Sequence, residues 1–348
     1  MKLVLTAQHS EFGASFLEMD GFEVPAAYGG GQDEGSVLRS GCGLIDRSWI
    51  SRLELRGADR HRFLNGLVSA NVETLVPGEN VYGFFTDIQG RVLADVYVIA
   101  LEDRLWLELP AGQGVKIREH IEKYRVADRV EVCSLEDLLP LTLLGPESST
   151  VARRLGVPSM TLDGNCRATV FGTELHLDRR LLYGIDASTL WVSASIASEV
   201  WNQLAAAAGV VPVGVAALEE VRIEGGVGRW GRDFGDEHLP QETGLFEEAV
   251  DLEKGCYLGQ EIVARLHYKG KPKQLSVAVV IRGGEQPPDR AQVFVGETAV
   301  GALSSVAPSG DDWLGLGILR RKAVEEGRGI RLADGRELEI RPKTSTKR

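Results

Sequence analysis

The most informative segment of this 348-residue chain is Lys254-Gly-Cys-Tyr-Leu-Gly-Gln-Glu261. Its one thiol, Cys256, lies two residues from Lys254, and positive charge near sulfur favours the thiolate form. A helix that begins near Gly259 would add the positive end of its dipole. The opposing interpretation is a buried, inert cysteine, which is the more common state of a lone thiol. The residues alone leave both interpretations open.

Basic residues follow this segment directly, and they form the only dense basic cluster in a chain of formal net charge −11. An acidic surface repels nucleic acids and anionic membranes, so any contact with a polyanion must be local. The cluster is either a solvated loop or a site for a polyanionic tail or an RNA backbone. Its members are Arg265, Lys269, Lys271 and Lys273.

A glycine-rich segment lies further upstream, at Arg222-Ile-Glu-Gly-Gly-Val-Gly-Arg-Trp-Gly-Arg-Asp233. It satisfies Gly-x-Gly-x-x-Gly, but a dinucleotide site needs an apolar strand before the glycines and a helix after them, and the sequence favours neither. Glu224 could accept two parallel hydrogen bonds from an amino-pyrimidinone edge, because a carboxylate has two acceptor oxygens. The alternative is a surface ion pair with Arg222.

Asp95 stands among Val and Leu residues in a predicted strand over 92–100. Apolar surroundings can raise a carboxyl pKa and produce a general base. Asp95 could equally lie at the end of the strand and face water. The chain has no nucleophile-elbow, zincin or P-loop motif, so those hydrolase and NTPase classes find no support.

Composition indicates an ordinary globular protein, with 43% hydrophobic and 26% charged residues. Its length predicts at least two packed units. The four cysteines are scattered, so we expect no disulfide scaffold, zinc site or self-contained iron–sulfur cluster, and therefore no bound metal. No apolar run is long enough for a membrane span or a secretory signal, so we expect a cytoplasmic protein without membrane contact.

The hydrophobic patterns predict an α+β architecture with an all-β unit at the C-terminal end. Strands are expected over 50–56, 82–85, 92–100, 129–133, 275–281, 292–295 and 313–319. Helices are expected over 57–67, 113–125, 195–208 and 215–220. The predicted domains are an N-terminal arm with a flexible loop (1–35), an α+β region of two subdomains (36–267), a linker (268–274), a small β-barrel (275–342) and a disordered tail (343–348).

The segment at 254–261 resembles the Lys-Gly-Cys-aromatic-x-Gly-Gln-Glu signature of YgfZ-type proteins. These are folate-binding members of the glycine-cleavage T-protein (aminomethyltransferase)/YgfZ superfamily. The motif residues are Lys254, Gly255, Cys256, Tyr257, Gly259, Gln260 and Glu261. Further segments similar to the superfamily are Gly43-Leu-Ile-Asp-Arg-Ser48, Pro77-Gly-Glu-Asn-Val-Tyr82, Arg222-Ile-Glu-Gly-Gly226 and Leu239-Pro-Gln-Glu-Thr-Gly-Leu245.

The resemblance implies a T-protein-like fold of several domains that binds tetrahydrofolate or a one-carbon-substituted folate. Glu224 would hold the pterin edge and Tyr82 would pack near it, with Arg222 and Lys254 also assigned to the cofactor. The basic cluster would contact a polyglutamyl tail or RNA. Asp95 aligns with a paired Asp-Asp of the aminomethyltransferases, but Ala94 replaces the other carboxylate, which puts a catalytic role for Asp95 in doubt.

The T-protein branch usually has Asp at the position of Cys256 and Arg at the position of Gln260. These departures imply an accessory protein for iron–sulfur cluster assembly or repair, including in enzymes that modify tRNA, with Cys256 as its reactive group. The alternative is a folate-dependent aminomethyltransferase or demethylase of the T-protein type. A structural module with a vestigial pocket is the third interpretation.

Overall fold

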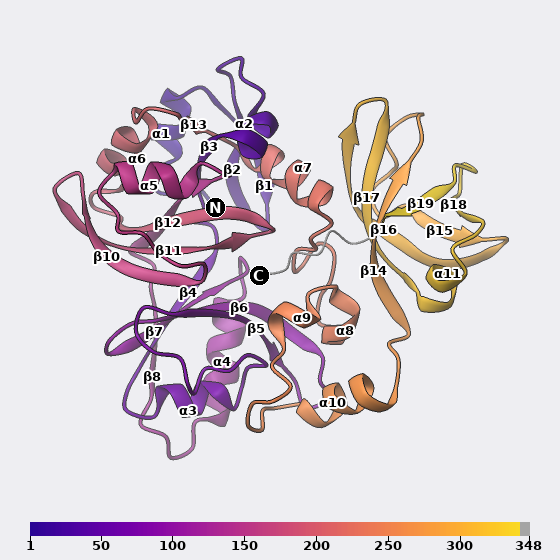
Figure 1. The fold of residues 1–348 in the computed structure, drawn as a ribbon, viewed down its shortest axis with the longest axis horizontal. Helices are drawn as coiled ribbons and strands as arrows, with labels where there is room; N and C mark the ends of the chain where they lie inside the picture. The colour runs from indigo at the N-terminus through magenta and orange to yellow at the C-terminus, as the bar shows by residue number, and fades with distance from the viewer. Residues whose placement is uncertain (342–348) are drawn as a thin grey trace. The chain divides into compact units, whose positions relative to one another are not determined.

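The computed structural model describes residues 1–341, which form two compact units (Figure 1). The first unit contains residues 1–64, 72–81 and 96–221, and the second contains 65–71, 82–95 and the chain from 222 onward. The predicted continuous region 36–267 therefore contributes residues to both units. The predicted tail at 343–348 lies outside the described residues. No helix within residues 1–341 is long and apolar enough to cross a membrane.

The N-terminal segment of the first unit forms regular secondary structure. It contains α1 (Thr6–Glu11) and a hairpin of β1 (Ala14–Met19) and β2 (Phe22–Tyr28). The imidazole of His9 is fully buried and bridges Asp46 Oδ2 and the Tyr28 hydroxyl, at 2.9 Å each. These contacts and the buried side chain of Val24 fix the segment within the first unit.

A six-stranded sheet forms the larger part of the first unit, in the order β10-β11-β12-β9-β3-β13. Helices α5 and α6 cover one face, where Trp201, Leu190 and Val151 share a core. The sheet strands are β3 (Cys42–Asp46), β9 (Leu138–Leu144), β10 (Gly164–Val170), β11 (Thr173–Leu182), β12 (Ile185–Ser193) and β13 (Val210–Pro212). The helices are α2 (Glu34–Ser40), α5 (Ser148–Arg154), α6 (Ala197–Ala205) and α7 (Val215–Gly225).

A five-stranded sheet has the order β5-β6-β7-β4-β8. Strands β5 and β6 each have residues in both units. The strands predicted near 50–56 and over 92–100 are confirmed as β4 and β6. Apolar and polar residues alternate in β4, whereas β6 is mostly apolar, and both patterns are typical of strands with buried faces. The elements are β4 (Ser51–Arg56), α3 (Arg60–Asn65), β5 (Asn80–Thr86), β6 (Val92–Ala100), β7 (Arg104–Leu109), α4 (Gly114–Tyr124) and β8 (Glu131–Ser134).

The C-terminal part of the second unit is an antiparallel six-stranded sheet in the order β18-β15-β16-β17-β14-β19. The sheet curls into a half-barrel, where the sequence predicted a small β-barrel (Figure 1). An isolated bridge between Arg331 and Glu337 lies where its two edges approach each other. The strands are β14 (Gln274–Ile281), β15 (Gln292–Val295), β16 (Thr298–Ser309), β17 (Asp312–Arg320), β18 (Ile330–Leu332) and β19 (Leu338–Arg341), and the helices are α8 (Pro240–Thr243), α9 (Phe246–Ala249), α10 (Gln260–Lys269) and α11 (Arg321–Glu326).

Candidate functional site

The ammonium of Lys254 is buried and bound by backbone. It donates to the carbonyl oxygens of Asn65, Val68 and Ala70, at 2.7, 2.7 and 2.6 Å. An ammonium has three N–H donors, so these three carbonyls use its full capacity. Lys254 therefore fixes the segment 65–70 to the signature loop, a structural role that the sequence did not indicate. Its assignment to the cofactor stays a prediction.

Cys256 is exposed, so the interpretation of a buried, inert thiol is wrong. It lies in a loop that Asp251 supports, since Asp251 Oδ1 accepts hydrogen bonds from the amides of Glu253 and Lys254 at 2.8 and 3.1 Å. A reactive role needs an accessible sulfur, and the loop supplies one.

Gly259 joins the signature loop to α10, which begins at Gln260 as the sequence predicted. Its φ is +82°, and a Cβ placed there would lie 2.3 Å from the carbonyl oxygen of Asp87 and 2.8 Å from Gly90 Cα. Only glycine fits this close approach between two backbone segments. The motif residue Gln260 is half-buried and Glu261 is exposed in the first helical turn.

Tyr82 on β5 and Asp95 on β6 form a hydrogen-bonded pair in the second unit. The tyrosine hydroxyl donates to Asp95 Oδ2 at 2.8 Å, and both side chains are half-buried. The Tyr82 ring packs edge-on against Phe84, with centroids 5.8 Å apart. Asp95 thus lies within a strand and is partly enclosed, which corrects the interpretation of a strand-end residue facing water.

Arg222, on the last turns of α7, has no exposed side-chain area. Its Nη1 lies 2.6 Å from Asp233 Oδ2, and its Nη2 donates to Ser305 Oγ at 3.0 Å. Burial alone would raise the pKa of Asp233, but the charge of Arg222 and the hydroxyls of Ser304 and Ser305 hold it below its ordinary value. The expected surface ion pair of Arg222 with Glu224 is therefore wrong. The assignment of Arg222 to the cofactor stays a prediction.

Glu224 follows on the same helix and is half-buried. Its backbone carbonyl accepts a hydrogen bond from Arg341 Nη1 at 3.0 Å, which ties the end of α7 to β19. The chain then turns at Gly226, where φ is +76°. After α7 the next helix is α8, which begins at Pro240, and the glycines follow a helix rather than a strand, so the segment lacks the strand–turn–helix of a dinucleotide site.

Tyr257 is a feature that the sequence analysis treated only as a motif position. Its side chain is buried, and its hydroxyl has no hydrogen-bond partner. Burial raises its pKa well above the ordinary value, so the hydroxyl stays protonated and able to donate. Buried hydroxyls normally have a hydrogen-bond partner, so the Tyr257 hydroxyl is available to donate to a ligand or a water molecule. Lys254 Nζ lies 5.2 Å from the centre of the Tyr257 ring.

The basic cluster is exposed in all four members. Lys271 Nζ lies 4.0 Å from Glu325 Oε1, a long surface ion pair. The arrangement is that of a solvated surface, and no feature of it selects RNA. Within residues 1–341, no group of three or more His, Cys, Asp or Glu side chains is placed to hold a metal ion.

Comparison with known proteins identifies the family. Residues 5–254 match the model of the GCVT N-terminal domain, and the chain belongs to that family. It is 26% identical over 279 residues to an aminomethyltransferase of Herpetosiphon aurantiacus, covering 78% of this chain and 76% of that protein. It is 28% identical over 315 residues to an aminomethyltransferase of Symbiobacterium thermophilum, covering 85% and 83%.

A solved structure shares the fold over almost the whole chain. The glycine cleavage system aminomethyltransferase T of Bartonella henselae superimposes with a TM-score of 0.87, covering 98% of this chain and 97% of that chain at 23% identity. The T-protein-like fold implied by the sequence is thereby confirmed. The relatives cited here carry the aminomethyltransferase name, whereas the assignment to the YgfZ branch stays a prediction.

Proposed function

We propose that this chain binds tetrahydrofolate and acts as a folate-dependent, aminomethyl-type one-carbon transferase. The observation that carries the proposal is the Tyr82–Asp95 pair, a half-buried carboxylate oriented by a phenol in a protein with the T-protein fold. The aminomethyltransferase relatives favour this function over the iron–sulfur accessory role that the signature implied.

Glu224 is the proposed anchor of the pterin. Its two carboxylate oxygens suit the paired N–H donors of an amino-pyrimidinone ring, and half-burial strengthens such bonds by removing competing water. The buried Arg222–Asp233 pair holds the turn of α7 that bears Glu224. Arg265, Lys269, Lys271 and Lys273 are available on the surface for an anionic folate tail.

The orphan hydroxyl of Tyr257 provides a test of whether the second unit fits a polar ligand. A buried donor without a partner is unfavourable in the free protein, and a folate heteroatom or an ordered water could accept its hydrogen bond. Together with Glu224 and Asp95, the unit offers acceptors and a donor of the kind that a reduced pterin requires.

Tetrahydrofolate, when bound, supplies nitrogen atoms that take up a one-carbon unit. Asp95 is suited to receive the proton that a donor amine must lose, or to stabilise positive charge that develops beside it. Tyr82 fixes the orientation of that carboxylate by donating to one oxygen. Because the second carboxylate of the aminomethyltransferases is Ala94 here, Asp95 would perform this role alone.

The experiment is an assay of methylenetetrahydrofolate formation from tetrahydrofolate and an aminomethyl donor. We expect Asp95→Asn to lower kcat by about 100-fold or more, the usual contribution of general acid–base catalysis. Glu131→Gln, which changes an exposed carboxylate on β8, is the matched control and should retain full activity. Absence of turnover by the wild type, with folate binding intact, would refute the transferase assignment.

The iron–sulfur accessory role is a second candidate, and the exposed thiol of Cys256 in the signature loop favours it. Cys256→Ser should then lower iron–sulfur enzyme activity in cells that depend on this protein. Cys133→Ser is the control, because Cys133 is also exposed but lies on β8. Unchanged enzyme activity in the Cys256→Ser strain would eliminate a role for this thiol.

A further inference from the structure

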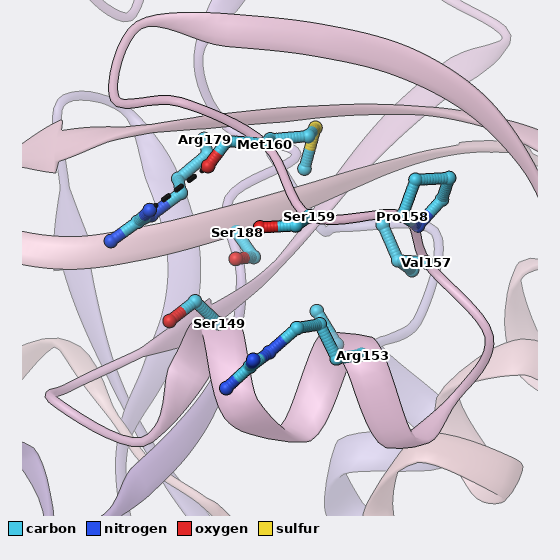
Figure 2. A pocket seen from close by; sticks show the side chains of 9 residues that line it. Ser149, Arg153, Val157, Pro158, Ser159, Met160, Arg179 and Ser188 are labelled. Carbon is cyan, nitrogen blue, oxygen red and sulfur yellow. Dashed lines mark hydrogen bonds between the residues drawn. The ribbon is translucent and has the colours of Figure 1, made fainter.

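A separate cavity of about 220 Å³ lies in the first unit, between α5, the strands β11 and β12, and the segment 157–160. Figure 2 shows Ser149 and Arg153 on the helix and Arg179 and Ser188 on the strands. None of these residues has a role in the proposed transferase chemistry. The polar residues that line it are Ser149, Arg153, Ser159, Arg179 and Ser188.

Ser188 is the first sign that the cavity takes a polar ligand. The residue has 0% exposure, and its hydroxyl has no hydrogen-bond partner. Its neighbours on β12 are Ala187, which belongs to an apolar core, and Thr189, whose hydroxyl lies 3.2 Å from Thr142 Oγ1, so neither adjacent residue supplies a partner. A buried hydroxyl without a partner is unfavourable, and a ligand that accepts its hydrogen bond relieves that cost.

Two arginines give the cavity its charge. Arg179 is held rigidly, since its Nε and Nη2 donate to Asp186 at 3.1 and 3.0 Å. Its Nη1 also donates to the Met160 carbonyl at 3.0 Å, the bond drawn in Figure 2. Arg153 makes one weak contact, from Nη2 to Thr150 Oγ1 at 3.4 Å, and its guanidinium is exposed. The carboxylate of Asp186 neutralises only one of the two guanidinium groups, those of Arg153 and Arg179, so the lining keeps a net positive charge.

We propose that this cavity binds a small tetrahedral oxyanion, a phosphate ion or the phosphate group of a small molecule. Guanidinium groups bind phosphate oxygens through paired hydrogen bonds, and serine hydroxyls supply further donors. The volume lies below the roughly 300–1,000 Å³ of sites that enclose whole drug-sized ligands. The ligand is therefore an ion or a terminal group, with the remainder of any larger molecule outside.

The test is calorimetric titration of inorganic phosphate into the full chain, against sodium chloride of equal ionic strength. We expect saturable binding in the millimolar range or tighter with phosphate alone. Arg153→Ala and Ser188→Ala should each weaken it by about tenfold, the loss of one charged or buried hydrogen bond. Arg154→Ala is the matched control, since Arg154 is a neighbouring exposed arginine whose Nη2 donates to the Ala208 carbonyl at 3.2 Å.

Ser188→Ala separates binding from folding, because removing an unpartnered hydroxyl should leave the melting temperature unchanged or raise it. Titrations with glycerol phosphate and with phosphate then distinguish an esterified from a free ligand. Two results would overturn the proposal: no saturable phosphate binding to the wild type, or equal weakening by Arg154→Ala and Arg153→Ala.

Discussion

The hydroxyl of Tyr82 lies 2.8 Å from Asp95 Oδ2, which joins adjacent regions of β5 and β6 within the second unit. The phenol donates, so it sets the direction of the carboxylate. A residue that orients a catalytic group affects the rate less than the group itself.

Tyr82→Phe should therefore lower kcat of methylene transfer by about tenfold, less than Asp95→Asn, because a general base lost outright costs about 100-fold or more. The ring remains packed on Phe84, so the melting temperature should change little. Steady-state kinetics of the two variants measure the difference. A larger loss in Tyr82→Phe than in Asp95→Asn would contradict these assignments.

Lys254→Met should destabilise the fold. It leaves the carbonyls of Asn65, Val68 and Ala70 without their shared donor, and each unpaired buried group costs about 1–3 kcal/mol. We expect a loss of at least about 3 kcal/mol in the free energy of unfolding, measured by urea titration. Lys269→Met, at an exposed lysine on α10, serves as the control. Equal stability of the two variants would show that the three hydrogen bonds are not needed.

Gly259→Ala should destabilise much more than Gly255→Ala. The first substitution places a Cβ 2.3 Å from the Asp87 carbonyl oxygen at a positive φ, whereas at Gly255 the nearest atom is Asn65 Nδ2 at 4.0 Å. Left-handed geometry alone costs a non-glycine residue about 1–2 kcal/mol, and the steric overlap adds to this. Urea unfolding of both variants gives the comparison. Similar urea midpoints for the two variants would mean that the backbone around Gly259 shifts to accommodate the Cβ at little energetic cost.

The buried Arg222–Asp233 pair predicts a pH dependence of stability. The folded-state pKa of Asp233 is lowered, so its contribution is present above the unfolded-state pKa of about 3.9 and is lost as pH falls through the folded-state pKa. Asp233→Asn should cost about 3 kcal/mol at neutral pH, because Arg222 loses its counter-charge. The gap between wild type and variant should narrow below roughly pH 4. Urea unfolding at several pH values between neutral and acidic measures this difference in the free energy of unfolding. A difference that does not change with pH would contradict the paired geometry.

Much of the secondary structure could be predicted from local patterns. The strand over 92–100 is apolar except for Asp95, and β15 at Gln292–Val295 lies between turn residues, so both were identified with their bounds. Each unit is built from three separate segments of the chain. This division could not be predicted, because it depends on contacts between segments far apart in the sequence. The sheet strands over 138–193 were missed for the same reason.

The candidate site shows a similar division. Asp95 and Tyr82 were found separately, but their hydrogen bond depends on the register of β5 and β6. Lys254 was read from its neighbour Cys256, whereas its partners come from residues almost two hundred positions earlier, which no local pattern reveals. Arg222 can be buried because Asp233 and Ser305 pair with its guanidinium. Asp233 is only 11 residues away in the sequence, whereas Ser305 is too distant for a local pattern to reveal.

Titration of tetrahydrofolate into the wild type and Glu224→Gln examines the proposed ligand contact itself. A glutamine has one acceptor oxygen and an NH₂ group, so it cannot accept two parallel hydrogen bonds from the pterin edge. We expect saturable binding to the wild type and at least about tenfold weaker binding to Glu224→Gln, with unchanged binding to Glu131→Gln, which alters an exposed carboxylate on β8. Equal affinity of Glu224→Gln and the wild type, or no binding to either, would contradict the assignment of a folate site to this chain.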